Sequence, residues 1–239
     1  MLLNDTGEAR LAADKLGTMW HSQVLSLVSM LVTFGSLLLG LVGALHGSVG
    51  GFGFVLLVSL AGVAAMLIGS IMYLAALYGL GPVDENYRRA FGWAVVGVVL
   101  SLIGSAVGEG SSLYQPLNIA ASSLSLAVMW IVLQATGRLL AQAGREELAG
   151  QGRLAFWLSV ASLVLNGVTE FFTALLAALE GAAAGGLVVL LIALAMSIAG
   201  AILYILYLRS AASAMAAYAL EGKRRLEAEL ERERGANKS

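Results

Sequence analysis

The residues whose types and spacing could do chemistry lie in the fifth long apolar stretch of the chain. Glu170 is the only acidic residue inside any apolar stretch long enough to cross a membrane. Asn166 stands one helical turn before it, Thr173 nearly one turn after it, and Ser162 continues the same side. An acid in the hydrocarbon region of a membrane costs about 2.5–3.5 kcal/mol on insertion scales, so Glu170 should face other helices. These four residues form the candidate intramembrane polar site.

Two interpretations of Glu170 stay open at the level of sequence. In the first, the acid is protonated and hydrogen-bonds between helices. In the second, it is a proton- or cation-binding position on a transport path. No Lys or Arg lies inside the apolar stretches to neutralise it. Its partners are therefore expected among hydroxyl and amide groups of other stretches, such as Thr33 and Tyr73, or water.

The rest of the sequence lacks the residue sets that catalysis or cofactor binding requires. There is no Cys, and His21 and His46 are the only imidazoles. No Walker loop, dinucleotide-binding glycine motif, H-E-x-x-H pattern or G-x-S-x-G elbow occurs. A formal net charge of −1 is not the basic balance that nucleic-acid binding needs. The sequence leans against an enzyme, and we expect no cofactor, no metal site and no nucleic-acid partner.

The composition is that of a protein built for lipid. Hydrophobic residues make up 59% of the chain and charged residues 12%, whereas soluble domains average about 25% charged residues. Six stretches approach or exceed the roughly 20 apolar residues that a membrane-spanning helix needs. They cover approximately residues 24–45, 54–78, 90–107, 117–133, 154–179 and 187–208.

The positions of the basic residues predict the topology. All 14 Lys and Arg fall before the first stretch, in the second and fourth connections, or after the sixth stretch. By the positive-inside rule that side is cytoplasmic. The sequence predicts an all-α polytopic bundle of a cell membrane, with six transmembrane helices as three hairpins and short cytoplasmic helical extensions at both ends. We divide it into a cytoplasmic or interfacial amphipathic segment (1–22), a transmembrane domain (23–208) and a charged helical tail (209–239).

Several residues are expected at the cytoplasmic surface. Asp5 and Glu8 resemble a capping box that opens a short interfacial helix before the first span. Trp20 would lie at headgroup depth, where an amphipathic ring is stable. Arg88 and Arg89 either anchor the topology or hold lipid phosphate. In the same connection, Gly81-Pro82 ends a helix and Asp84 can cap the next one.

Two surfaces could hold protein partners. Opposite charges four residues apart favour a helix after residue 209, and Leu226 and Leu230 give it one short apolar seam. This helix is either solvated or binds a partner. Gly104 and Gly108 form a G-x-x-x-G pair, and Gly97 continues the row, which serves either packing inside the bundle or a homo-oligomer.

The sequence favours a non-catalytic membrane scaffold or accessory subunit. The alternative is a small transporter or channel-like protein with a proton- or cation-binding site at Glu170. The layout resembles that of small multipass proteins of bacterial inner membranes, a likeness of architecture that no diagnostic motif carries. That resemblance implies a cytoplasmic membrane and no particular activity.

Overall fold

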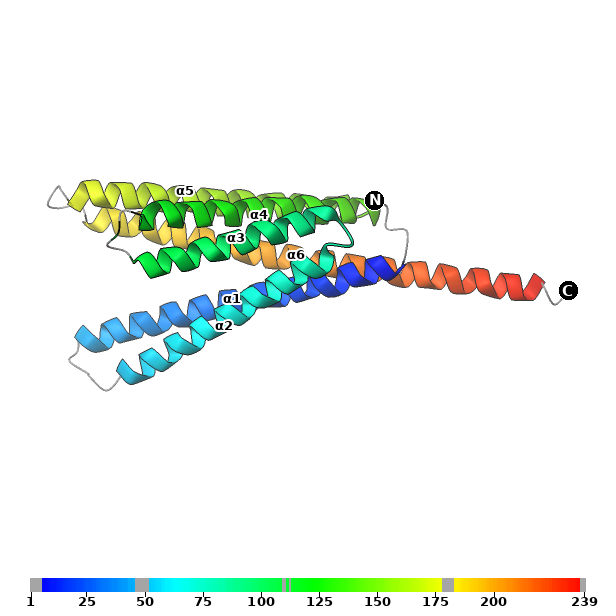
Figure 1. The fold of residues 1–239 in the computed structure, drawn as a ribbon, viewed down its shortest axis with the longest axis horizontal. Helices are drawn as coiled ribbons and strands as arrows, with labels where there is room; N and C mark the ends of the chain where they lie inside the picture. Colours follow the sequence, from blue (N-terminus) through cyan, green and yellow to red (C-terminus); the bar gives the residue numbers. More distant parts are fainter. Residues whose placement is uncertain (1–5, 46–51, 109–110, 112, 178–182, 237–239) are drawn as a thin grey trace.

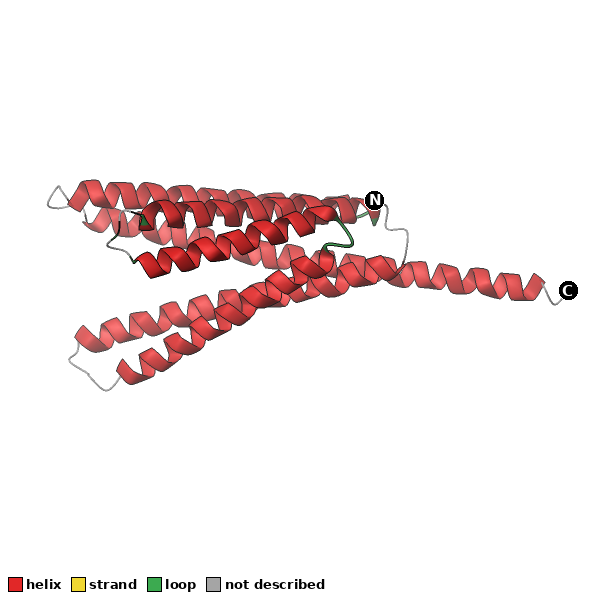
Figure 2. Ribbon diagram, viewed as in Figure 1, coloured by secondary structure: helices red, strands yellow, loops and turns green. Residues whose placement is uncertain are grey.

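The computed structural model describes residues 6–45, 52–108, 111, 113–177 and 183–236. Within the helices, the described part leaves out the side chains of residues 6, 37, 38, 41–45, 52, 54, 166–177, 183–191, 193, 235 and 236. Helices make up nearly all of the described chain, which contains no strand (Figure 2). The prediction of an all-α fold is confirmed.

Each of the six α-helices includes the described part of one of the six apolar stretches, and α1 and α6 extend well beyond theirs (Figure 1). In chain order they are α1 (Thr6–Leu45), α2 (Phe52–Leu80), α3 (Glu85–Val107), α4 (Tyr114–Gln142), α5 (Ala149–Ala177) and α6 (Ala183–Ala236), with a short 3-10 helix, η2 (Glu146–Leu148), before α5.

Five segments of the described chain are long and apolar enough to cross a membrane, and they lie on α2 to α6. The described side chains of α1 do not meet this criterion of length and hydropathy. The apolar stretch of α1 also includes residues 37, 38 and 41–45, whose side chains lie outside the described part. Length and composition therefore identify a helical membrane protein.

The helices pack mainly in sequence-neighbour pairs. α1 packs against α2, α3 against α4, and α5 against α6, while α1 also packs along α6 and joins the first pair to the rest. Figure 1 shows that the α1–α2 pair meets the other helices near the start of α1 and diverges from them toward the opposite end. α6 crosses the whole bundle and continues past it to the C-terminus.

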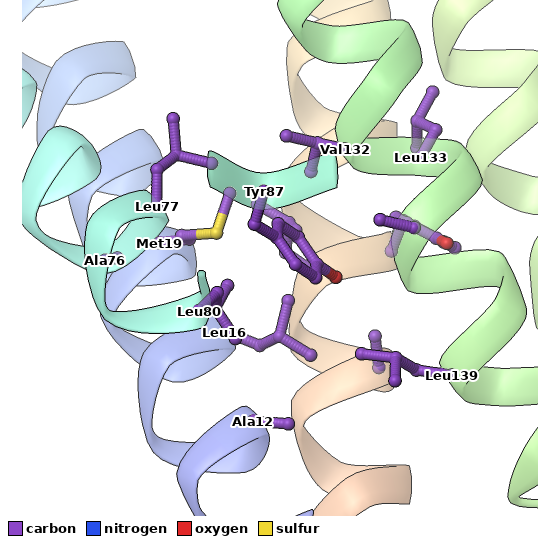
Figure 3. Close-up of a cluster of buried hydrophobic side chains, with 14 of the residues drawn as sticks. Ala12, Leu16, Met19, Ala76, Leu77, Leu80, Tyr87, Val132, Leu133 and Leu139 are labelled. Carbon is purple, nitrogen blue, oxygen red and sulfur yellow. The ribbon is translucent and has the colours of Figure 1, made fainter. Parts of the chain in front are cut away.

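The large buried side chains gather at the end where the pairs meet. We call it the basic end, because around it lie Arg10, Lys15, Arg88, Arg138 and Arg209. Five helices contribute the most deeply buried large residues, several of which are drawn in Figure 3: Leu16, Met19, Leu77, Leu80, Tyr87, Leu140, Tyr207, Leu208 and Met215. Charged groups are costly inside lipid, so we expect the charged residues of this end at the membrane surface, where water surrounds the side chains that are not buried.

Apart from Val128, the buried positions away from the basic end are small among the described residues. They are Ser29, Ser36, Gly62, Gly69, Gly97, Gly104, Ala121, Ser162 and Gly200. Lipid tails are as apolar as Leu, so helices in lipid gain little from burying large apolar side chains and instead associate by close approach through small ones.

The α1–α2 contact shows this most clearly. Its α1 side is a row of hydroxyl residues spaced four and three apart: Ser22, Ser26, Ser29, Thr33 and Ser36. Gly62 and Gly69 of α2 lie against that row, and a Cβ at Gly69 would come within 2.7 Å of Ser26 Oγ and 3.1 Å of the Ser22 carbonyl oxygen. The sequence analysis noted a small-residue row only on the third stretch.

The small-residue row of α3 is covered by α4. Positions for a Cβ at Gly97 and Gly104 lie 3.8 Å from Leu124 Cβ and 3.7 Å from Leu117 Cβ. These two glycines therefore serve packing within the bundle. Gly108 ends α3 at a φ of 77°, a conformation that favours glycine.

The helix ends agree in part with expectation. Asp84 caps α3, because its Oδ1 accepts a hydrogen bond from the Asn86 backbone N–H at 2.9 Å. The short separate helix expected before the first span is wrong: α1 is a single helix of 40 residues. Leu16 and Met19, fully buried in the core, explain its continuity, because tertiary packing holds its first turns in place. Asp5 of the expected capping box lies outside the described residues.

Gly69→Leu should separate α1 from α2, because the new side chain meets α1 backbone that cannot move aside. Overpacking of this kind costs about 1–3 kcal/mol. We expect a melting temperature several degrees lower in detergent micelles. Gly35→Leu is the matched control, since a Cβ at Gly35 meets nothing within 4 Å. Equal melting temperatures for the two variants would contradict close packing at Gly69.

Candidate functional site

The candidate polar site predicted from sequence lies on α5. Its backbone is helical through all four positions, and Ser162 is buried, with 4% of its surface exposed. The side chains of Asn166, Glu170 and Thr173 lie outside the described residues, so their grouping stays a prediction. Ser159 lies one turn before Ser162 on the same face of α5, and we call this face the polar stripe. Ser159 lies against α6, because a Cβ at Gly200 would be 3.1 Å from the Ser159 Oγ.

Two expected partners of Glu170 are described, and each occupies a different environment. The Tyr73 hydroxyl lies 3.3 Å from the Tyr204 hydroxyl and links α2 to α6. Thr33 Oγ1 is buried against Gly62 and has no hydrogen-bond partner in the described part of the chain. Neither contact joins Tyr73 or Thr33 to the polar stripe of α5.

The expected interfacial residues are placed at the basic end. Arg88 is exposed, and Arg89 forms an exposed ion pair with Glu85 at 3.1 Å. Trp20 is half-buried, and the Arg209 guanidinium carbon lies 5.5 Å from the centre of its ring. A cation over an indole face is attracted by the ring quadrupole. Trp20 therefore links α1 to α6. Its position at headgroup depth stays a prediction.

A pair of buried hydroxyl groups crosses the core. The Tyr87 hydroxyl of α3 lies 2.7 Å from Thr136 Oγ1 of α4, and both residues are fully buried. Figure 3 shows the Tyr87 ring pointing from α3 into the middle of the core. A buried hydroxyl without a partner would cost about 1–3 kcal/mol, so the pair fixes how α3 and α4 meet. No local sequence pattern singles out Tyr87, because its partner lies 49 residues away in the chain.

Comparison with known proteins yields no relative. No family model, curated protein or solved structure matches this chain.

Two pockets lie at the basic end, and α6 forms a wall of each. One, of about 470 Å³, contains Arg145 of the α4–α5 connection together with Arg209 and Ser210 of α6. The other, of about 430 Å³, lies where the first turns of α1 approach Ala219 and Lys223 of α6. Arginines and hydroxyls can bind anions, and the described lining of neither pocket contains an acid, a base and a nucleophile together.

Glu170→Gln tests the two interpretations of the polar stripe. Gln has nearly the size and hydrogen-bonding capacity of a protonated Glu, so we expect an unchanged melting temperature and an unchanged proton permeability of protein-containing liposomes. Glu170→Leu removes the hydrogen bond and should lose on the order of 1 kcal/mol of stability.

The opposite result would favour transport. A Glu170→Gln variant that folds normally but loses a proton- or cation-driven flux seen in the wild type would contradict the interpretation of Glu170 as a protonated residue that only hydrogen-bonds between helices. The flux is measured with a pH-sensitive dye inside the liposomes.

Proposed function

We propose that the chain crosses the membrane six times, as three hairpins, with both termini in the cytoplasm. The pairwise packing of α1 with α2, α3 with α4 and α5 with α6 supports the hairpins. The position of every Lys and Arg in the termini, or in the connections at the basic end, supports the orientation. Residues 1–22 and 209–239 then contain the cytoplasmic extensions, and the basic end faces the cytoplasm.

Reporter fusions test this topology. Cytoplasmic signals are expected from fusions after Gly81, Gly144 and Ser239. Periplasmic or exterior signals are expected from fusions after Ser48, Ser111 and Ala183. The physical reason is the cost of moving basic loops across the membrane. An exterior signal from the C-terminal fusion would mean an odd number of spans.

We further propose that the protein is a non-catalytic membrane scaffold or accessory subunit that holds a partner through the end of α6. The observation that carries this proposal is the continuation of one packing stripe beyond the bundle. On α6, Ala211 and Met215 are fully buried, and both belong to the core. The spacing of three and four residues continues through Ala219 and Gly222 to Leu226 and Leu230.

In its last turns the stripe has no partner among the described residues. Gly7 and Arg10 of α1 line the same pocket as Ala219 and Lys223, so α1 accompanies α6 about that far. Beyond it, Leu226 and Leu230 are each 50% exposed. The face around them carries both signs of charge, including the ion pair of Lys223 with Glu227 at 3.6 Å. The occupant we propose is an amphipathic helix of another protein at the cytoplasmic surface.

Site-specific photo-crosslinking in living cells tests this proposal. A photoreactive residue at position 226 or 230 should yield one discrete product with a different protein. Ala228 and Arg232 lie on the opposite face of the helix and are the matched control positions. The product from position 226 should disappear when Leu230→Asp is added, because a charge in the seam opposes helix docking.

Three results would contradict the proposal. They are equal crosslinking from both faces, products that contain only a second copy of this chain, and no protein product at all. Deletion of residues 223–239 provides the folding control, since the tail contributes only exposed pairs and should leave the melting temperature unchanged.

A further inference from the structure

The pocket between α6 and the α4–α5 connection has the groups of an anion site. Its polar lining residues are Arg145, Arg209, Ser210 and Ser213. Ser213 already donates its hydroxyl to the Arg209 carbonyl oxygen at 3.0 Å. The donors that remain for a ligand are therefore the two guanidinium groups and the Ser210 hydroxyl.

A defined turn places Arg145. Gly144 has a φ of 71°, in the left-handed region that favours glycine, and terminates α4. The Arg145 N–H donates to the Leu140 carbonyl at 2.8 Å, and the Gly144 N–H donates to the Ala141 carbonyl at 3.0 Å. These are the two hydrogen bonds of a Schellman motif, which fixes where the chain leaves the helix. Arg145 is thus held at the mouth of the pocket by backbone geometry.

Arg209 is held by a ring rather than by a carboxylate. Its guanidinium lies over Trp20, and it forms no ion pair with any described residue. Arg145 has one carboxylate partner, Glu147, at 3.4 Å, and both members of that pair are largely exposed. An exposed pair of this kind is weak and exchanges easily. The pocket is therefore left with a net positive charge.

The pocket lies where the apolar stretch of α6 ends. Leu206, 47% exposed, lies on its wall three residues before Arg209, at the end of the apolar stretch of α6. Leu148 and Ala214 add apolar surface beside the arginines. The pocket thus combines basic and hydroxyl residues with an apolar edge, as a phosphate group attached to acyl chains requires.

We propose that this pocket binds a phosphate group, with Arg145 and Arg209 as its charged ligands and the Ser210 hydroxyl as a further donor. The source is the headgroup of an anionic phospholipid in the adjacent leaflet. A soluble phosphate compound has the same recognition chemistry, and the experiment separates the two sources.

The test uses the full-length protein in nanodiscs of phosphatidylcholine with increasing fractions of phosphatidylglycerol. Native mass spectrometry measures the lipids that stay bound to the released protein. Wild type should retain phosphatidylglycerol in preference to phosphatidylcholine. The double variant Arg145→Gln/Arg209→Gln should lose this preference by on the order of tenfold or more, because charge-assisted hydrogen bonds are the stronger class.

Two further variants keep the result interpretable. Arg153→Gln/Arg225→Gln removes the same charge from residues outside the pocket and should retain the preference. Ser210→Asp leaves the Arg209–Trp20 contact in place but adds a negative charge to the pocket, so it should lose the preference even if the double arginine variant folds poorly. Melting temperatures are recorded for all variants.

A second arm titrates inorganic phosphate and glycerol phosphate into wild type in pure phosphatidylcholine nanodiscs by calorimetry. Phosphatidylglycerol selectivity that depends on the arginines, with no binding of soluble phosphate at millimolar concentration, supports the lipid source. Binding of soluble phosphate that depends on the arginines, without lipid selectivity, supports the phosphate site and overturns its lipid source. Binding in neither arm, or equal loss in the control variant, overturns the site.

Discussion

Burial of large apolar side chains away from water, which the described residues concentrate at the basic end, is the constraint on which the remaining structure depends. Leu16, Leu80 and Tyr87 are fully buried there, and the alternative surroundings of these side chains would be water. In the apolar halves of the helices the alternative is lipid, which offers no such gain. Those halves pack through serine and glycine, as at Ser26 and Gly69, and the α1–α2 pair diverges from the other helices away from the basic end (Figure 1).

α6 links the core at the basic end to both proposed binding surfaces. Its middle part supplies Tyr207, Leu208 and Met215 to the core, so its direction at the basic end is fixed by packing. Arg209 lies on the same segment, which is why it is held beside Trp20 and faces the pocket next to Arg145. Past the core the same helix continues to Ala236, and its packing stripe leaves the bundle as an exposed seam. One helix thus contains both the proposed phosphate site and, beyond it, the proposed partner seam.

Much of the fold follows from local patterns in the sequence, and the contacts that define the site do not. The six helices were predictable because apolar length and charge are local properties, and Asp84 was predictable as a cap because capping acts within three residues. The Tyr87–Thr136 pair and the Trp20–Arg209 contact join residues far apart in sequence and leave no periodic signal. The four-and-three spacing of hydroxyls from Ser22 to Ser36 was a usable signal that the sequence analysis missed. Glu170 was singled out by its charge alone, and its surroundings depend on side chains outside the described part.

The most direct test of the central claim compares two leucines of α2. Leu80 is fully buried at the basic end, whereas Leu60, on the same helix, is 60% exposed on the apolar surface. The measurement is the free energy of unfolding of Leu80→Ala and Leu60→Ala in mixed micelles. The account predicts a loss of about 2–5 kcal/mol for Leu80→Ala and a change within about 0.5 kcal/mol for Leu60→Ala. Equal losses for the two variants, or a larger loss for Leu60→Ala, would contradict it.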